Sequence, residues 1–239
     1  MPNHAIITGA GSGVGQAIAL ALVKKGWVVS IIGRRAEALK DTVTKAGANA
    51  PQLDAYALDI ADAAGVAKTV ATAITKRGGV QVLVNAAGTN IPKRSLEVLS
   101  TNDWHAVLDA NLNGTYYMVN AVLPAMRAQK IGTIVNIVSD AGLKANPKAG
   151  PSYVASKFAV SGLTQAINCE EQKNGIRATA IYPGDINTPL LDKRPVPPPM
   201  EARKSMLQAD DVAACALLAI ELPYNAVVEE LLLRPRATG

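Results

Sequence analysis

The chain alternates short apolar runs with longer stretches of helical character along its whole length. Continuous Val, Ile and Leu content is typical of strands that are covered on both faces, as in a parallel sheet. The alternation therefore predicts an α/β fold: a single Rossmann-like, doubly wound domain over residues 1–239, with a seven-stranded, mostly parallel sheet and helices on both faces. The predicted strands are residues 4–9, 27–33, 54–59, 80–88, 132–139, 177–184 and 229–235.

Some helix ends can also be predicted. The stretch 102–128 has Asn102 or Asp103 as its candidate N-cap. Gly175 closes "KNG" and is typical of the residue that follows a helix.

Residues 184–206 interrupt the alternation, because five of the fourteen prolines lie there and no run is typical of a strand. We expect a substrate lid at about residues 187–206 rather than a linker between domains.

Composition argues against several classes of protein. Hydrophobic residues make up 49% of the chain and charged residues 18%, as in a soluble globular protein. Cys169 and Cys215 form no C-x-x-C, which suits a reduced, cytoplasmic setting. His4 and His105 lack metal-like spacing, so we expect no metal site and neither a zinc hydrolase nor a Ser-His-Asp enzyme. The start lacks the layout of a signal peptide, and no membrane partner is expected.

The charge balance is basic, with a net charge of +5 and a pI near 9.2. Basic residues are scattered among acidic ones, and aromatic residues are only 4%. Both features argue against a nucleic-acid partner. An anionic cofactor or substrate explains the balance equally well.

A glycine-rich segment, "TGAGSGVG" at residues 8–15, joins the first predicted strand to a helix. Glycines permit a tight turn and let backbone N–H groups approach a pyrophosphate, while the helix N-terminus favours the same anion. The alternative is a merely tight strand-to-helix turn. The candidate cofactor-binding residues here are Gly9, Ser12, Gly13, Val14 and Gly15.

The end of the second predicted strand bears on the choice of cofactor. NAD enzymes usually place an acidic residue there for the ribose 2′-hydroxyl, whereas this strand ends in Gly33, Arg34 and Arg35. A guanidinium suits a 2′-phosphate, so NADP(H) is favoured over NAD(H). Alternatively, both arginines simply begin the next helix as solvated charges.

Tyr153 and Lys157 are four residues apart in "YVASK", a spacing that puts both on one face of a helix. A nearby ammonium favours the phenolate, so we expect Lys157 to lower the pKa of Tyr153 toward use as a proton donor or acceptor. Taken alone, the pair is more typical of an ordinary helix surface, so the rest of the chain must decide.

Six motifs in order carry a resemblance to the short-chain dehydrogenase/reductase family over residues 4–190. They are "TGAGSGVG" (8–15), "NAAG" (85–88), "NLNG" (111–114), "IVSDAG" (137–142), "YVASK" (153–157) and "YPGDINTP" (182–189). The resemblance implies an oxidoreductase that transfers a hydride between NADP(H) and a small carbonyl or alcohol substrate, such as a ketone, an aldehyde, a secondary alcohol or a hydroxy acid.

The resemblance also implies roles for the matching residues. Tyr153 would exchange the proton, Lys157 would lower its pKa and bind the nicotinamide ribose, and Ser139 would hold the substrate oxygen. Asn111 would support a water-linked proton relay. Asp59 and Ile60 would contact the adenine. The remaining implied cofactor contacts are Asn85, Ala86, Gly88, Pro183, Gly184, Ile186 and Thr188.

The chain departs from the family pattern in two places. Fourteen positions separate Ser139 from Tyr153, one more than expected, and the loop between them carries Lys144 and Lys148, which contact either an anionic substrate or solvent. The tail after residue 221 lacks a "VDGG"-like segment and resembles the serine and 3-hydroxy acid dehydrogenase branch. The resemblance implies a homodimer or homotetramer, with the helix that bears Tyr153 packed against its symmetry mate. Ala155, Ala159 and Gly162 would permit such close packing of two helices.

Other functions remain open at this stage. A non-catalytic NADP(H)-binding sensor or scaffold would share the fold, although it would not need Ser139, Tyr153 and Lys157. A sugar-nucleotide epimerase or dehydratase normally carries a larger C-terminal domain. The substrate pocket is expected at residues 90–96, 140–151 and 187–206, where Lys93 and Arg94 are either anion ligands or surface charges.

Overall fold

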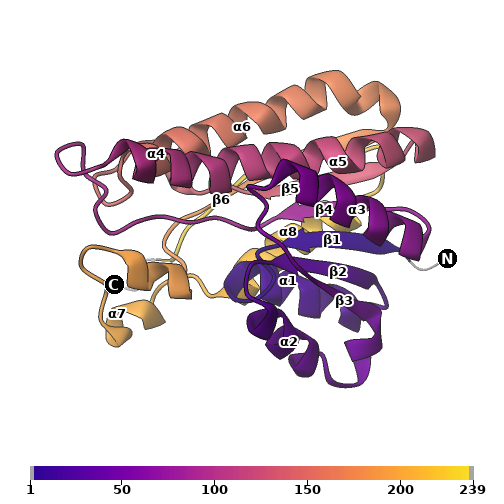
Figure 1. The fold of residues 1–239 in the computed structure, drawn as a ribbon, viewed down its shortest axis with the longest axis horizontal. Helices are drawn as coiled ribbons and strands as arrows, with labels where there is room; N and C mark the ends of the chain where they lie inside the picture. Colours follow the sequence, from indigo (N-terminus) through magenta and orange to yellow (C-terminus); the bar gives the residue numbers. More distant parts are fainter. Residues whose placement is uncertain (1–2, 237–239) are drawn as a thin grey trace.

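The computed structural model describes residues 3–236, and its seven strands form one sheet. The strand order is β3-β2-β1-β4-β5-β6-β7, and every neighbouring pair is parallel (Figure 1). The predicted doubly wound sheet is thus confirmed, and it is parallel throughout. The strands are β1 (His4–Thr8), β2 (Val28–Gly33), β3 (Leu53–Ala57), β4 (Val82–Asn85), β5 (Gly132–Ile137), β6 (Ile176–Pro183) and β7 (Glu230–Leu233).

Helices cover both faces of the sheet (Figure 1). On one face lie α3 (Ala63–Arg77), α4 (Thr101–Leu108), α5 (Gly114–Gln129) and α6 (Pro151–Glu171). The other face carries α1 (Gly13–Lys24), α2 (Ala36–Lys45) and α8 (Ala209–Glu221). Each layer buries its own apolar cluster against the sheet, so the core is two-sided, as in other doubly wound folds.

The two edge strands differ from the expectation of cover on both faces. β1, β2, β4, β5 and β6 are buried along almost their whole length. In β3 and β7, buried or half-buried residues instead alternate with more exposed ones. An edge strand has a neighbour on one side only, so less of its surface is covered.

The helical stretch predicted at 102–128 begins earlier and contains an irregular turn. Its N-cap is Ser100, whose hydroxyl accepts a hydrogen bond from the Asp103 backbone N–H, so the prediction of Asn102 or Asp103 is wrong. A π-helical turn at Asp109–Asn113 joins α4 to α5. At the other predicted helix end, Gly175 has a φ of +74° and follows the 3-10 turn Gln172–Asn174 after α6, as expected.

The proline-rich segment contains a 3-10 turn at Pro189–Lys193 and a short helix, α7 (Met200–Lys204). Its strand-like pairing is limited to one bridge between Ile186 and Leu207. Among residues 3–236, no helix combines the length and the apolar character needed to cross a membrane.

Candidate active site

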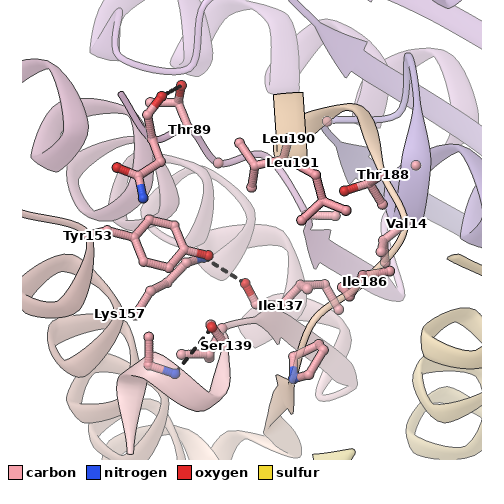
Figure 2. Close-up of a pocket in the computed structure, with 18 of the residues that line it drawn as sticks. Val14, Thr89, Ile137, Ser139, Tyr153, Lys157, Ile186, Thr188, Leu190 and Leu191 are labelled. Atoms are coloured by element: carbon pink, nitrogen blue, oxygen red, sulfur yellow. Dashed lines mark hydrogen bonds between the residues drawn. The ribbon is translucent and has the colours of Figure 1, made fainter. Parts of the chain in front are cut away.

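A cavity of about 650 Å³ lies at the carboxyl ends of the strands. All seven strands contribute residues at or just beyond their carboxyl ends. The strand order reverses between β1 and β4, the position at which doubly wound folds bind ligands. Figure 2 shows Tyr153, Lys157 and Ser139 on one side of this cavity, with Thr188, Leu190 and Leu191 on the opposite side.

The glycine-rich loop forms one wall. Gly9 has a φ of +68°, and a β-carbon there would lie 2.7 Å from the Ala86 carbonyl oxygen. Gly9, Ser12, Gly13 and Val14 all line the cavity, and α1 begins at Gly13. This narrow approach beside a helix N-terminus fits a dinucleotide pyrophosphate. Gly15 does not line the cavity: its α-carbon packs against Gly9, where a β-carbon would lie 2.6 Å from the carbonyl oxygen.

The ends of β2 and β3 form the next part of the wall. Gly33 and Arg34 line the cavity, whereas Arg35 lies outside the lining at the N-cap position of α2. Of the two arginines, only Arg34 therefore borders the cavity. Asp59 and Ile60, just after β3, both line the cavity, and the Asp59 carboxylate accepts a hydrogen bond from the Ala61 N–H at 3.1 Å.

Tyr153, Lys157 and Ser139 meet on the cavity wall, as expected. The Lys157 ammonium lies 5.6 Å from the centre of the Tyr153 ring and donates a 2.9 Å hydrogen bond to the Ile137 carbonyl. The Ser139 hydroxyl accepts from the Ala141 N–H at 3.2 Å. These contacts bring the start of α6 and the end of β5 to one point of the cavity.

Burial dominates the ionisation of this group. Desolvation raises the pKa of Tyr153, and the Ser139 side chain with the guanidinium groups of Arg194 and Arg94 act in the opposite direction. Desolvation also lowers the pKa of Lys157 to about 8. The prediction of a lowered tyrosine pKa is therefore wrong for the chain by itself, because burial of the phenol outweighs the nearby charges.

Asn111 lies behind this wall rather than on it. It is buried in the π-helical turn, where its side chain accepts from the Thr89 N–H at 2.7 Å and donates to the Thr89 carbonyl and the Ser156 hydroxyl, each at 3.0 Å. A β-carbon on Gly88 would lie 3.5 Å from the Asn111 Oδ1 and 3.7 Å from the Lys157 Nζ. Gly88 thus leaves open the space between the two side chains.

Comparison with known proteins settles the family. The model of the short chain dehydrogenase family matches residues 3–196. This chain is a short-chain dehydrogenase. It is 34% identical to an uncharacterized oxidoreductase of Staphylococcus saprophyticus over 232 residues, which cover 97% of this chain and 96% of that relative.

Solved structures agree with this short-chain dehydrogenase over almost their whole length. An alcohol dehydrogenase of the archaeon Thermococcus sibiricus, complexed with 5-hydroxy-NADP, has a TM-score of 0.86 and 27% identity, covering 98% of this chain and 97% of that one. A 3-ketoacyl-(acyl-carrier-protein) reductase of Brucella melitensis, complexed with NADH, has a TM-score of 0.89 with the same identity and coverage. The chain is therefore an oxidoreductase that transfers a hydride by means of a nicotinamide cofactor.

The other candidate residues of this short-chain dehydrogenase divide into two groups. Asn85 lies within the sheet, outside the lining, and donates a 2.9 Å hydrogen bond to Asn136 on β5. The expectation that its side chain lines the cofactor ribose is therefore corrected. The candidates that do line the cavity are Ala86, Gly88, Pro183, Gly184, Ile186 and Thr188.

The charged candidates near the expected substrate pocket also divide. Lys93 and Lys144 are exposed and outside the lining, whereas Arg94 and Lys148 are part of it. Arg94 is buried despite its charge. This position has no signal in the sequence, because burial of an arginine depends on which loops surround it.

Several lining residues were not expected as individual site residues. Thr89 follows "NAAG", and its hydroxyl accepts a 2.7 Å hydrogen bond from the Lys193 ammonium. Arg194 on the cavity wall forms an ion pair with Asp185. Residues 187–206 were expected near the pocket as a whole, but only the folded chain shows that Lys193 and Arg194 reach these partners. Arg234, after β7, also lines the cavity.

Proposed function

We propose that this short-chain dehydrogenase interconverts a small carbonyl compound and the corresponding alcohol, with NADP(H) as its cofactor. The observation that carries the proposal is a single cavity that holds Ser139, Tyr153 and Lys157 at one end and the glycine-rich loop with Arg34 at the other. Position and proton transfer are what the protein must supply in such a reaction, because the hydride belongs to the bound nicotinamide.

Tyr153 is the proposed proton donor in the direction of reduction. Its raised pKa keeps the phenol protonated near neutral pH, which is the form that a donor requires. In the direction of oxidation the same oxygen takes up a proton, and the Lys157 ammonium stabilises the phenolate that precedes this step. The Ser139 hydroxyl orients the substrate oxygen toward Tyr153.

The remaining candidates hold the cofactor or support the proton donor. Gly9, Ser12, Gly13 and Val14 would bind the pyrophosphate. Asn111 supports the donor indirectly, since its side chain bonds both Thr89, next to Gly88, and Ser156 on the helix that carries Tyr153. The proposed adenine and nicotinamide contacts are Asp59, Ile60, Ala86, Gly88, Pro183, Gly184, Ile186 and Thr188.

The charge of Arg34 supports NADP(H) over NAD(H). Arg34 lines the cavity at the end of β2. Its charge also contributes, after desolvation, to the lowered pKa of Lys193, whose ammonium donates to the Thr89 hydroxyl. Within residues 3–236, neither Arg34 nor Lys193 is ion-paired with a carboxylate. A 2′-phosphate would supply the missing negative charge.

The test compares NADPH with NADH by following nicotinamide absorbance with ketones, aldehydes and oxo acids. We expect the wild type to prefer NADPH and Arg34→Gln to lower kcat/KM for NADPH by about 10-fold or more, with little change for NADH. Lys40→Gln on the exposed face of α2 is the matched control and should change neither value. A wild type that prefers NADH would overturn the cofactor assignment. NADPH binding without turnover of any substrate would favour a non-catalytic sensor.

We also propose that two copies associate through α6. Ala155, Ala159 and Gly162 are only partly covered, and a β-carbon at Gly162 would meet nothing within 4 Å. Phe158 on the same helix is 45% exposed. Light scattering at several concentrations tests this proposal, and Gly162→Gln should shift the mass toward that of one chain.

A further inference from the structure

Arg94 is an unusual residue for the wall of a cavity, because it is charged and only 6% exposed. Its guanidinium donates to three backbone carbonyl oxygens: Ile91 at 2.6 Å, Lys148 at 3.1 Å and Lys193 at 2.5 Å. The three carbonyls belong to three different pocket loops, after β4, after β5 and after β6. Arg94 therefore lies where these loops converge.

The positive charge of Arg94 is not neutralised by the protein. Within residues 3–236 it forms no ion pair, whereas its neighbour Arg194 is paired with Asp185. Desolvation lowers the pKa of Arg94, and the charge of Arg194 acts in the same direction. Burial of an unpaired charge is unfavourable unless a counter-charge joins it.

Hydrogen-bonding capacity also remains on Arg94. A guanidinium has five N–H donors, and the three bonds to carbonyls use one on Nε and one on each terminal nitrogen. One N–H therefore remains on each terminal nitrogen. Two such donors match the two oxygens of a carboxylate.

Arg94 also lies next to the start of the helix that carries Tyr153. A β-carbon on Gly150 would lie 2.8 Å from the Arg94 β-carbon and 2.7 Å from its carbonyl oxygen. Gly150 is the N-cap residue of α6, one helical turn before Tyr153. The charge of Tyr153 in turn influences the pKa of Arg94, which places the two side chains in one electrostatic environment.

We propose that Arg94 binds a carboxylate of the substrate, so that this enzyme acts on short oxo acids and the corresponding hydroxy acids. The inference rests on the proposed carbonyl chemistry and adds the substrate class. In reduction, the carbonyl carbon takes the hydride from NADPH and the carbonyl oxygen takes the proton from Tyr153, while the carboxylate is unchanged. The carboxylate orients the substrate and supplies the negative charge that pairs with Arg94.

A purely structural role for Arg94 must be separated from this one, because Arg94 also holds three loops together. The comparison uses oxo acids and their methyl esters, which have the same carbonyl but no negative charge. Loss of loop order would lower kcat/KM for acid and ester by the same factor. Loss of a carboxylate contact would lower it for the acid alone, mainly through KM.

The experiment measures both substrates with the wild type, Arg94→Met, Arg94→Lys and the charge-matched control Lys93→Met. We expect the wild type to have a higher kcat/KM for the acid than for its methyl ester. Arg94→Met should lower this acid-to-ester ratio by at least about 10-fold. Arg94→Lys should restore part of the preference, and Lys93→Met should leave it intact. Equal losses for acid and ester, or a wild type that prefers the ester or a phosphate-bearing ketone, would overturn the proposal.

A second measurement uses only the wild type and therefore does not depend on how the variants fold. Propanoate should inhibit competitively with the carbonyl substrate, and propanamide should not. Equal inhibition by the two would count against the carboxylate site. If neutral ketones are reduced and acids are not, the carbonyl chemistry stands and the substrate class is wrong. If no carbonyl compound is reduced, both proposals fail.

Discussion

Lys157 donates a 2.9 Å hydrogen bond to the carbonyl oxygen of Ile137. Ile137 is the last residue of β5, two positions before Ser139, and Lys157 lies one helical turn after Tyr153 on α6. The bond therefore fixes the helix that bears the phenol to the strand end that bears the serine. Together with the bond from the Ser161 hydroxyl to the Gly142 carbonyl, it holds the proposed proton donor beside the proposed substrate-orienting hydroxyl.

Tyr153→Phe tests the proton donor. The variant keeps the ring that packs beside Lys157 and loses only the hydroxyl, so we expect turnover to fall by about 100-fold or more while NADPH affinity changes little. Steady-state rates and a binding titration measure the two effects. Tyr116→Phe is the control, since Tyr116 is half exposed on α5 and outside the cavity lining. Full activity of Tyr153→Phe would exclude the assigned role.

Lys157 should make stability depend on pH in the alkaline range. Its pKa is about 8 in the folded chain and 10.5 when unfolded, so the unfolded chain binds more protons between these values and stability rises with pH there. The burial of charged Lys157 lowers the free energy of unfolding, and this penalty is fully present below pH 8. It decreases by about 3 kcal/mol as the pH rises to 10.5.

Urea unfolding of the wild type and Lys157→Met across this range isolates the contribution of Lys157, because every other group titrates in both proteins. The difference in unfolding free energy should shift in favour of the wild type as pH increases. Parallel stability curves would mean that the pKa of Lys157 is not depressed.

Gly9→Ala should be far more damaging than another glycine substitution at similar φ. Gly26 has a φ of +84° and open space around it, so Gly26→Ala should destabilise by only about 1–2 kcal/mol, from backbone strain alone. Gly9→Ala adds a contact of 2.7 Å with the Ala86 carbonyl oxygen. Unfolding curves and NADPH titrations compare them, and similar losses in the two variants would contradict the close approach at Gly9.

Asn111→Ala should lower stability by about 1–3 kcal/mol, because the Thr89 backbone groups and the Ser156 hydroxyl lose a buried partner. Asn113→Ala in the same π-helical turn is the control. Within the described part of the chain its side chain donates only to the Asp109 carboxylate, so we expect a smaller effect. Denaturant unfolding measures the loss of stability in both variants. A larger loss in Asn113→Ala than in Asn111→Ala would contradict the hydrogen bonds described for Asn111.

Most of the features that a local pattern determines could be predicted from the sequence, although the N-cap of α4, Ser100, could not. Apolar runs predicted all seven strands, and the spacing of Tyr153 and Lys157 predicted that they share a site, because helical periodicity is a property of the chain itself. The same holds for the glycine-rich loop, whose position between a strand and a helix is visible before any folding is considered.

What could not be predicted depends on neighbours that are distant in the chain. The direction of the Tyr153 pKa depends on how deeply the phenol is buried, and spacing gives no information on depth. Arg34 and Arg35 are adjacent arginines in the sequence. In the fold, Arg34 lines the cavity, whereas Arg35 is the N-cap residue of α2 and lies outside the lining. Two of the three carbonyl partners of Arg94, those of Lys148 and Lys193, lie more than fifty residues away from it in the chain.

The π-helical turn at Asp109–Asn113 has a consequence for how this helix tolerates changes in length. A π turn holds an extra residue compared with an α turn, so it places one more residue between α4 and α5 without rotating either helix. Deleting one residue within the turn would therefore leave a regular α-helix with Val107 and Met118 both still buried. Making the turn α-helical without a deletion would instead rotate the side chains on one side by about 100°, and one of these two residues would leave its buried position. At its present length, this helix cannot be both perfectly regular and correctly packed.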